Sequence, residues 1–107
     1  MSASISTHVV TVSDLEAAKA VYGAVLGTPH TDAPYYVGFN LGGFEFGLTP
    51  GDPSSITYIS VEDLDTAHAA MIAAGATEQQ APTKVAPELR VSVLVDKDGN
   101  KIGLNGK

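Results

Sequence analysis

The acidic run near the C-terminus is the first place in the sequence where metal chemistry could be expected. Asp96, Asp98 and Asn100 alternate along this run, and alternating oxygen donors of this kind occur in calcium-binding loops. An EF-hand loop starting at Asp96 requires glycine at its sixth position and glutamate at its twelfth, but these positions hold Lys101 and Lys107. The run is therefore predicted to form a β-turn, with its glycine or asparagine accepting a positive φ.

Histidines are the other candidates for proton transfer. A serine–histidine–carboxylate triad needs a histidine that is oriented by a carboxylate and lies close to a serine. His30 falls in a predicted loop, and His68 lies between Leu64 and Ile72 on the apolar side of a predicted helix. Neither histidine has an evident serine partner in the sequence, and His68 is predicted to lie at the edge of the core. Phosphate-binding loops that end in Gly-Lys-Ser/Thr are absent from the sequence.

Two amphipathic segments are predicted to be helices. The first covers residues 13–27, with Ser13 or Asp14 as the N-cap and a final glycine as the stop. The second covers residues 62–76 and repeats the pattern, with Gly75 as the stop. In both segments apolar residues recur at steps of three and four, and a short strand rich in β-branched residues precedes each.

The chain repeats itself, which predicts two copies of a strand, a helix and about three further strands. Asp14 recurs as Asp63, 49 positions later, and the segment 43–48 recurs as 99–104, 56 positions later. This pattern predicts an α+β fold built from two tandem modules. The predicted single domain covers residues 1–107, with module one at about 4–49, a linker at about 50–55 and module two at about 56–107.

The amino-acid composition excludes several classes of binding partner. Twelve acidic residues against six Lys and Arg give a net charge of -6, which argues against nucleic acid and anionic membrane surfaces as partners. No apolar run approaches the roughly 20 residues that span a bilayer, and the N-terminus does not resemble a signal peptide. Cysteine is absent, so disulfides and thiol chemistry are excluded. We expect a cytoplasmic domain.

The paired modules resemble the vicinal oxygen chelate superfamily. The resemblance rests on the opening "THVVTVSDLEAAKAVYGAVLG" and the closing "VDKDGNKIGL", and it covers almost the whole chain. This family includes glyoxalase I, extradiol dioxygenases, fosfomycin-resistance enzymes and bleomycin-binding proteins. The resemblance implies two βαβββ modules that form a curved, mostly antiparallel sheet with a concave cleft. It also implies a homodimer, for which unpaired sheet edges supply a physical motive.

The resemblance also locates the metal ligands of the members that use a metal. Each module supplies one ligand from its first strand and one from its last, which in this chain are Thr7 and Gly47, then Ile56 and Gly103. Glycine and isoleucine cannot bind a metal through their side chains, and a lone threonine hydroxyl is a weak ligand. The comparison therefore implies no metal and no cofactor. His8 is one residue out of register and is predicted to point toward the helix side of its strand.

Strand alternation predicts which side chains line the cleft. The predicted ligand-binding residues are Thr7, Val9, Tyr36, Asn40, Glu45, Tyr58, Ser60, Arg90 and Ser92. On the strand that carries the last two, Val91, Val93 and Val95 are predicted to pack against a helix. The predicted lining has two aromatic rings, several hydroxyls, one carboxylate and one guanidinium, which suits a small organic molecule with a few polar groups.

Three functions remain open at this point. The first is a metal-free small-molecule-binding protein, similar to the bleomycin-resistance proteins, that sequesters an aromatic or antibiotic-like compound. The second is a metal-dependent lyase, isomerase or dioxygenase whose ligands this alignment misplaces, with His8 and Glu45 as candidates. The third is a dimeric structural or regulatory module without a small ligand. No catalytic residue is predicted.

Overall fold

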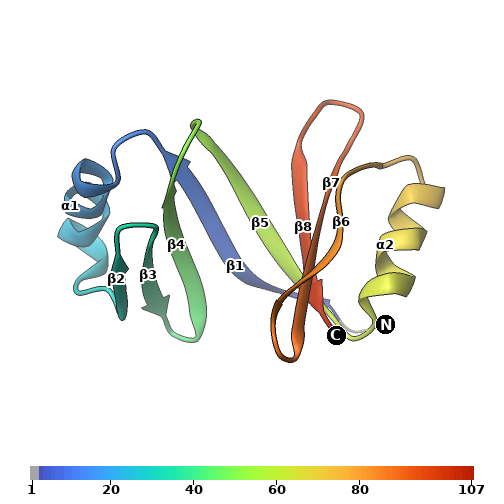
Figure 1. Ribbon diagram of the computed structural model, residues 1–107, viewed down its shortest axis with the longest axis horizontal. Coiled ribbons are helices and arrows are strands. Elements are labelled where there is room, and N and C mark those ends of the chain that lie inside the picture. The colour runs from blue at the N-terminus through green and yellow to red at the C-terminus, as the bar shows by residue number, and fades with distance from the viewer. Residues whose placement is uncertain (1–2) are drawn as a thin grey trace. The chain divides into compact units, whose positions relative to one another are not determined.

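The computed structural model describes residues 3–107, which divide into two compact units. The N-terminal unit comprises Ser6–Ile56, and the C-terminal unit comprises Thr57–Lys107 together with residues 3–5. Each half of the chain follows a βαβββ order, with one helix among its strands (Figure 1). The mixed α+β fold predicted from the internal repeat is therefore confirmed.

The first module has its strands in the spatial order β2-β3-β4-β1. Its elements are β1 (Ala3–Val12), α1 (Leu15–Leu26), β2 (Thr31–Ala33), β3 (Tyr36–Leu41) and β4 (Phe44–Pro50). β1 and β4 run parallel, whereas the β2–β3 and β3–β4 pairs are antiparallel.

The second module repeats this arrangement with the order β5-β8-β7-β6. Its elements are β5 (Ser54–Val61), α2 (Leu64–Ala73), β6 (Thr77–Ala86), β7 (Leu89–Val95) and β8 (Lys101–Gly106). β5 and β8 run parallel, and the β7–β8 and β6–β7 pairs are antiparallel. The parallel pairing of the first and last strand in both modules is the structural counterpart of the sequence repeat.

Both helices begin at an aspartate that caps them. Asp14 Oδ1 accepts a hydrogen bond from the backbone N–H of Ala17 at 3.0 Å, and Asp63 Oδ1 accepts one from that of Thr66 at 3.2 Å. Such caps satisfy amide groups that have no partner inside the helix. Neither helix in the described part of the chain is long and apolar enough to cross a membrane.

The core of the N-terminal unit lies between α1 and one face of its strands. Val37, Phe39 and Leu48 are buried and form its centre. Partly buried apolar residues pack around this centre: Val10, Leu15, Ala18, Tyr22, Leu26 and Phe46. Because side chains alternate along a strand, the residues between the core positions point to the opposite side.

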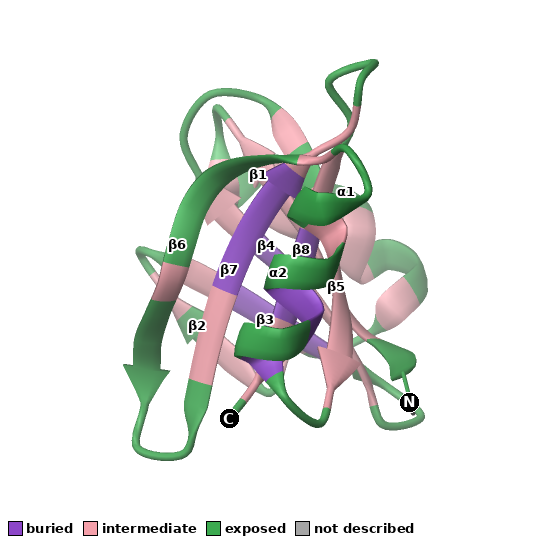
Figure 2. Ribbon diagram, turned by 90° about the vertical axis from the view of Figure 1, so that its right-hand side faces the viewer, coloured by how far each residue is buried: buried purple, intermediate pink, exposed green. Residues whose placement is uncertain are grey.

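The core of the C-terminal unit lies under α2. Figure 2 shows α2 in front of the buried middle part of β7, and Leu94 of that strand packs with Leu64 and Ala67 of the helix. Leu104 of β8 completes the buried centre. Ile59 also packs there.

The predicted orientation of β7 is wrong. Ser92 Oγ contacts His68 of α2, and Arg90 forms an ion pair with Asp65 of the same helix, so both residues lie on the helix side and not in a cleft. The error has a physical cause: alternation marks the valine face of β7 as the apolar one, but α2 covers the other face, where its own polar side chains satisfy Ser92 and Arg90. A fully buried serine is tolerated under the helix because the His68 ring satisfies its hydroxyl.

The acidic run between β7 and β8 forms the predicted turn. Asp96 Oδ1 accepts hydrogen bonds from the backbone N–H groups of Asp98 and Asn100, both at 2.9 Å. Gly99 adopts a φ of 84°, a conformation that glycine reaches without steric cost. Hydrogen bonds from Asn100, from its side chain first, lower the pKa of Asp96, so this carboxylate is stabilised as the anion by its own turn.

Candidate functional site

Each unit has its own candidate site, the strand surface that faces away from the helix of that unit. We call these surfaces the helix-free faces. In the N-terminal unit the helix-free face includes Thr7, Val9, Tyr36, Gly38, Asn40, Glu45 and Gly47; in the C-terminal unit it includes Tyr58, Ser60, Val93 and Gly103. Seven of the nine predicted cleft residues lie on these faces, and Arg90 and Ser92 do not.

Two glycines form the floor of the N-terminal helix-free face. Gly38 and Gly47 are direct partners across β3 and β4. The Tyr36 ring covers both, because a Cβ on Gly38 would lie 2.9 Å from Tyr36 Cε2 and a Cβ on Gly47 would collide with the Tyr36 hydroxyl and ring. Tyr36 therefore occupies the space into which a side chain at position 47 would project.

A polar network surrounds this ring. The Tyr36 hydroxyl donates a hydrogen bond to Glu45 Oε2, and His30 Nε2 lies 2.7 Å from Glu45 Oε1. The other ring nitrogen of His30 lies 2.8 Å from Thr31 Oγ1. Glu45 thus links the loop before β2 to β3 and β4. The sequence did not predict that His30 contacts Glu45. His30 lies in a loop, and the sequence of a loop does not indicate which strand the loop packs against.

Tyr36 is held as a proton donor. Burial, and to a lesser extent the hydrogen bond to the Glu45 carboxylate, raise the pKa of the Tyr36 hydroxyl above its usual range. Ionising Tyr36 would place a second negative charge beside Glu45, which a half-buried position disfavours. The phenol therefore stays neutral in conditions under which a free tyrosine would ionise.

A row of polar residues crosses the same face. Thr7 of β1 and Asn40 of β3 both stand opposite Glu45 in the strand register. Asn40 Oδ1 accepts a hydrogen bond from the backbone of Gly43 at 2.9 Å, so part of its hydrogen-bonding capacity serves the β3–β4 turn. His8, as predicted, lies on the helix side, where its ring centroid is 5.8 Å from that of Phe46.

The C-terminal helix-free face carries a second tyrosine over a second glycine. Tyr58 of β5 is the direct partner of Gly103 of β8, and a Cβ on Gly103 would collide with the Tyr58 ring. Burial raises the pKa of the Tyr58 hydroxyl, so this phenol is also kept neutral. Val93 flanks Gly103 on β7, and Ser60 follows Tyr58 two residues later on the same face.

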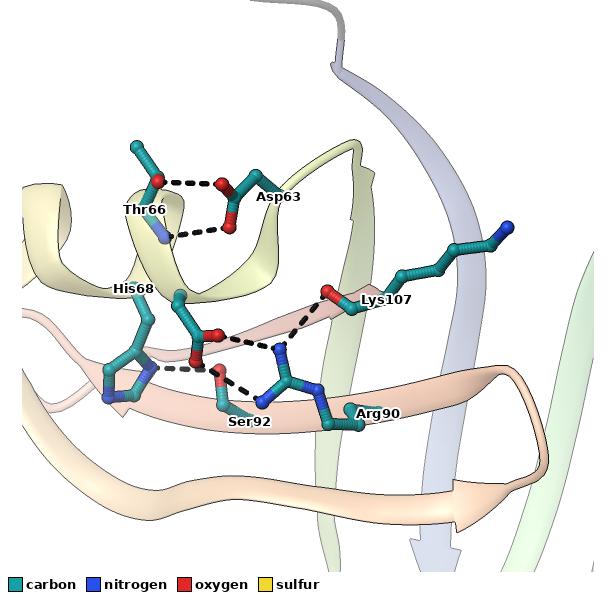
Figure 3. A network of polar contacts seen from close by, with 7 residues as sticks. Asp63, Thr66, His68, Arg90, Ser92 and Lys107 are labelled. Carbon is teal, nitrogen blue, oxygen red and sulfur yellow. Dashed lines mark hydrogen bonds and ion pairs between the residues drawn. The ribbon is translucent and has the colours of Figure 1, made fainter.

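A buried polar cluster lies on the helix side of the C-terminal unit. His68 is only 6% exposed; its Nδ1 lies 2.9 Å from Ser92 Oγ, and its Nε2 lies 2.7 Å from Glu78 Oε1. Close by, Arg90 binds both carboxylate oxygens of Asp65. Figure 3 shows Arg90 next to the contact between His68 and Ser92. The expectation that His68 lacks a serine partner is therefore wrong. The position of His68 on the apolar side of a helix was the signal that could have revealed the cluster, because a buried histidine needs hydrogen-bond partners.

The four superfamily metal positions do not fit a metal ion. Gly47 and Gly103 have no donor atom, and the space in front of each is filled by a tyrosine ring. Ile56 is apolar, and Thr7 offers a single hydroxyl. Within residues 3–107, no three His, Asp or Glu side chains lie close enough together to hold a metal ion.

Comparison with protein families matches residues 4–104 to the model described as "Glyoxalase/Bleomycin resistance protein/Dioxygenase superfamily". A member of that superfamily from Vibrio splendidus 12B01 has a similar structure: TM-score 0.76, 11% sequence identity, covering 99% of this chain and 100% of that chain. No curated protein matches the sequence.

Two solved structures with named activities are also similar. The Mn(II)-bound glyoxalase from Novosphingobium aromaticivorans has a TM-score of 0.73 and 19% identity, covering 95% of this chain and 38% of that chain. A methylmalonyl-CoA epimerase in complex with methylmalonyl-CoA and NH4+ has a TM-score of 0.69 and 16% identity, covering 96% of this chain and 93% of that chain. At these identities the similarity shows a shared fold, and the chemistry has to be read from the residues of the site.

Proposed function

The chain belongs to the glyoxalase/bleomycin resistance protein/dioxygenase superfamily, which confirms the resemblance found in the sequence, and we propose that it binds a small organic molecule without a metal ion. One observation carries this proposal. At both positions where the resemblance places a metal ligand on the last strand of a module, the chain has a glycine covered by a tyrosine ring, Tyr36 over Gly47 and Tyr58 over Gly103. An aromatic phenol in place of a metal ligand supports binding by stacking and hydrogen bonding.

The residues around the two rings indicate what kind of molecule would bind. Tyr36 presents an aromatic ring beside the Glu45 carboxylate, whereas Tyr58 lies beside the apolar Val93. Taken by itself, the N-terminal surface would match a compound with a flat apolar body and a hydrogen-bond donor; the C-terminal surface, also taken by itself, would match a more apolar compound. We therefore favour an aromatic, antibiotic-like compound over a small, strongly polar metabolite.

Ligand-induced thermal stabilisation tests the proposal. A compound that binds only the folded protein at 100 times its Kd adds about 2.7 kcal/mol to the free energy of unfolding. We expect stabilisation by aromatic compounds that is reduced in Tyr36→Leu and Tyr58→Leu. As a matched control, Arg90→Leu should leave binding unchanged, because Arg90 lies on the helix side. Loss of binding in Arg90→Leu alone would contradict the assignment of the faces.

A metal-dependent lyase, isomerase or dioxygenase is the second candidate. It is favoured by the fold similarity to the Mn(II)-bound glyoxalase and by the nitrogen and oxygen donors that meet where His30 contacts Glu45. His8 is unsuited to this role, since its ring packs against Phe46. Elemental analysis after purification without chelator separates the two candidates: stoichiometric manganese, nickel, zinc or iron would refute metal-free binding.

We also propose that the protein is a homodimer. β2 and β6 are the outermost strands of their modules, and among residues 3–107 each has one unpaired edge. Unpaired edges favour association unless they are protected. A monomeric sedimentation coefficient at micromolar concentration would refute this proposal.

A further inference from the structure

Each unit contains a histidine that bridges a hydroxyl group and a glutamate. In the C-terminal unit, His68 joins Ser92 to Glu78, with distances of 2.9 and 2.7 Å. In the N-terminal unit, His30 joins Thr31 to Glu45, with distances of 2.8 and 2.7 Å. In both cases Nδ1 meets the hydroxyl oxygen and Nε2 meets the carboxylate. The two clusters therefore share one connectivity of hydroxyl, imidazole and carboxylate.

The carboxylate determines where the histidine proton lies in the N-terminal cluster. An ionised glutamate can only accept hydrogen bonds, so His30 Nε2 must carry the proton that Glu45 receives. In the neutral imidazole, Nδ1 then has a free lone pair and must accept the hydroxyl proton of Thr31. His30 is therefore held in the tautomer in which it can act as a base toward Thr31, the arrangement that activates a hydroxyl nucleophile.

Glu45 is itself held in place by its other neighbours. The Tyr36 hydroxyl donates to its second oxygen, so both carboxylate oxygens are engaged. The lack of a side chain at Gly38 lets the His30 ring lie close to β3, because a Cβ there would be 2.9 Å from His30 Nε2. The base, its carboxylate and the supporting phenol are thus positioned by β3 and β4 and not by the loop alone.

Exposure separates the two clusters. Ser92 is completely buried and His68 is 6% exposed, so no substrate can reach the C-terminal cluster in the folded protein. The His30 side chain is 45% exposed and that of Glu45 is 28% exposed. Thr31 is half-buried. The C-terminal cluster stabilises the fold, whereas the N-terminal cluster is open to a ligand.

We infer that Thr31, His30 and Glu45 form an acyl-transfer site for small carboxylic esters, with Thr31 as the nucleophile and His30 as the base. Thr31 Oγ1 attacks the ester carbonyl carbon while its proton passes to His30 Nδ1. The bond from the acyl carbon to the alcohol oxygen then breaks, and His30 returns the proton to the departing alcohol. Water, activated by His30 in the same way, releases the acid and restores Thr31. Glu45 stabilises the protonated imidazole.

The inference goes beyond the proposed binding function and does not depend on it. An ester with an aromatic group suits the surface beside Tyr36, which lies next to Glu45. The exposed reaction site requires no metal ion and no co-reactant except water. Binding of an aromatic compound without any acyl transfer would leave the proposed function standing and would overturn only this inference.

The test uses p-nitrophenyl acetate and maps acetylation of the whole chain by peptide mass spectrometry. Thr31 acetylation is expected to exceed that of the lysines, which react without assistance. Thr31→Val should abolish the adduct, Thr31→Ser should retain it, and His30→Gln should slow it by about 100-fold or more, the range of general base catalysis. His8→Gln is the matched control, because this histidine lies against Phe46, and it should react like the original protein.

The outcomes are distinguishable even if one variant fails to fold. Circular dichroism first shows whether each variant is folded. If His30→Gln is unfolded, the comparison of Thr31→Val with Thr31→Ser still shows whether the Thr31 hydroxyl is the nucleophile. Acetylation of Thr31 that depends on its hydroxyl and on His30 supports the site. Absence of an adduct at Thr31, or release of p-nitrophenolate at an equal rate in Thr31→Val, overturns it.

Discussion

The buried contact between Ser92 and His68 allows a quantitative prediction about stability. Ser92→Val replaces the hydroxyl with a methyl group, adds a second methyl group to the packed core, and leaves His68 Nδ1 there without a donor. Ser92 is fully buried and His68 almost so, which prevents water from taking the place of the hydroxyl. An unsatisfied buried polar atom of this kind costs about 1–3 kcal/mol of stability.

A second substitution tests the cause of this loss. His68→Leu removes the unsatisfied nitrogen, and Glu78, whose side chain is 44% exposed, can then be hydrated. Replacing both partners of a buried hydrogen bond with apolar groups is often nearly neutral. The double variant Ser92→Val/His68→Leu should therefore lose less stability than the sum of the two single variants, with a coupling energy of about 1–2 kcal/mol.

Urea unfolding followed by circular dichroism measures these differences. A loss of 2 kcal/mol would lower Tm by about 8–16 °C in a chain of this size. Ser60→Val is the matched control on the helix-free face and should change stability by about 0.5 kcal/mol or less. A Ser92→Val variant as stable as the control, or strictly additive losses in the double variant, would refute the assigned orientation of β7.

Three further predictions concern the tyrosines and a helix cap. Gly103→Glu should lower stability by about 1–3 kcal/mol because the new side chain collides with Tyr58, and Tyr58→Ala should relieve the loss in thermal unfolding. Because the pKa of Tyr36 is raised in the folded protein, its contribution to stability is present below the ordinary tyrosine pKa of 10.0 and is lost as the pH rises beyond it. Tyr36→Phe should therefore lose less stability between pH 8 and pH 12, as measured by urea midpoints. Asp63→Ala should cost about 1 kcal/mol through loss of the α2 cap, seen as a lower urea midpoint with an unchanged slope.

The fold was predictable because several independent signals agree. Asp14 and Asp63 mark the helix starts, and each sits at the same place in the sequence repeat. Strand alternation also placed most of the helix-free faces correctly, because Ile59 and Val10 belong to strands with one clearly apolar side. At these positions the structure that the local sequence pattern favours is the one that the tertiary packing requires.

The parts that could not be predicted depend on contacts between distant segments. On β7, Val93 and Leu94 are equally apolar, and only the presence of α2 decides which one it covers. His30 comes to lie beside Glu45 because the loop before β2 folds back over the glycine floor. Neither the spacing nor the types of the residues indicate that this loop packs over the glycines, so only the structure shows the network around Glu45.

The two tyrosines also record how the halves of the chain diverged. Tyr58 reaches Gly103 from the neighbouring parallel strand, where the first module has Val9 opposite Gly47. Tyr36 reaches Gly47 from the antiparallel side. The space in front of the two equivalent glycines is therefore filled from non-equivalent strands, so the two halves share a backbone plan but differ in how this surface is packed.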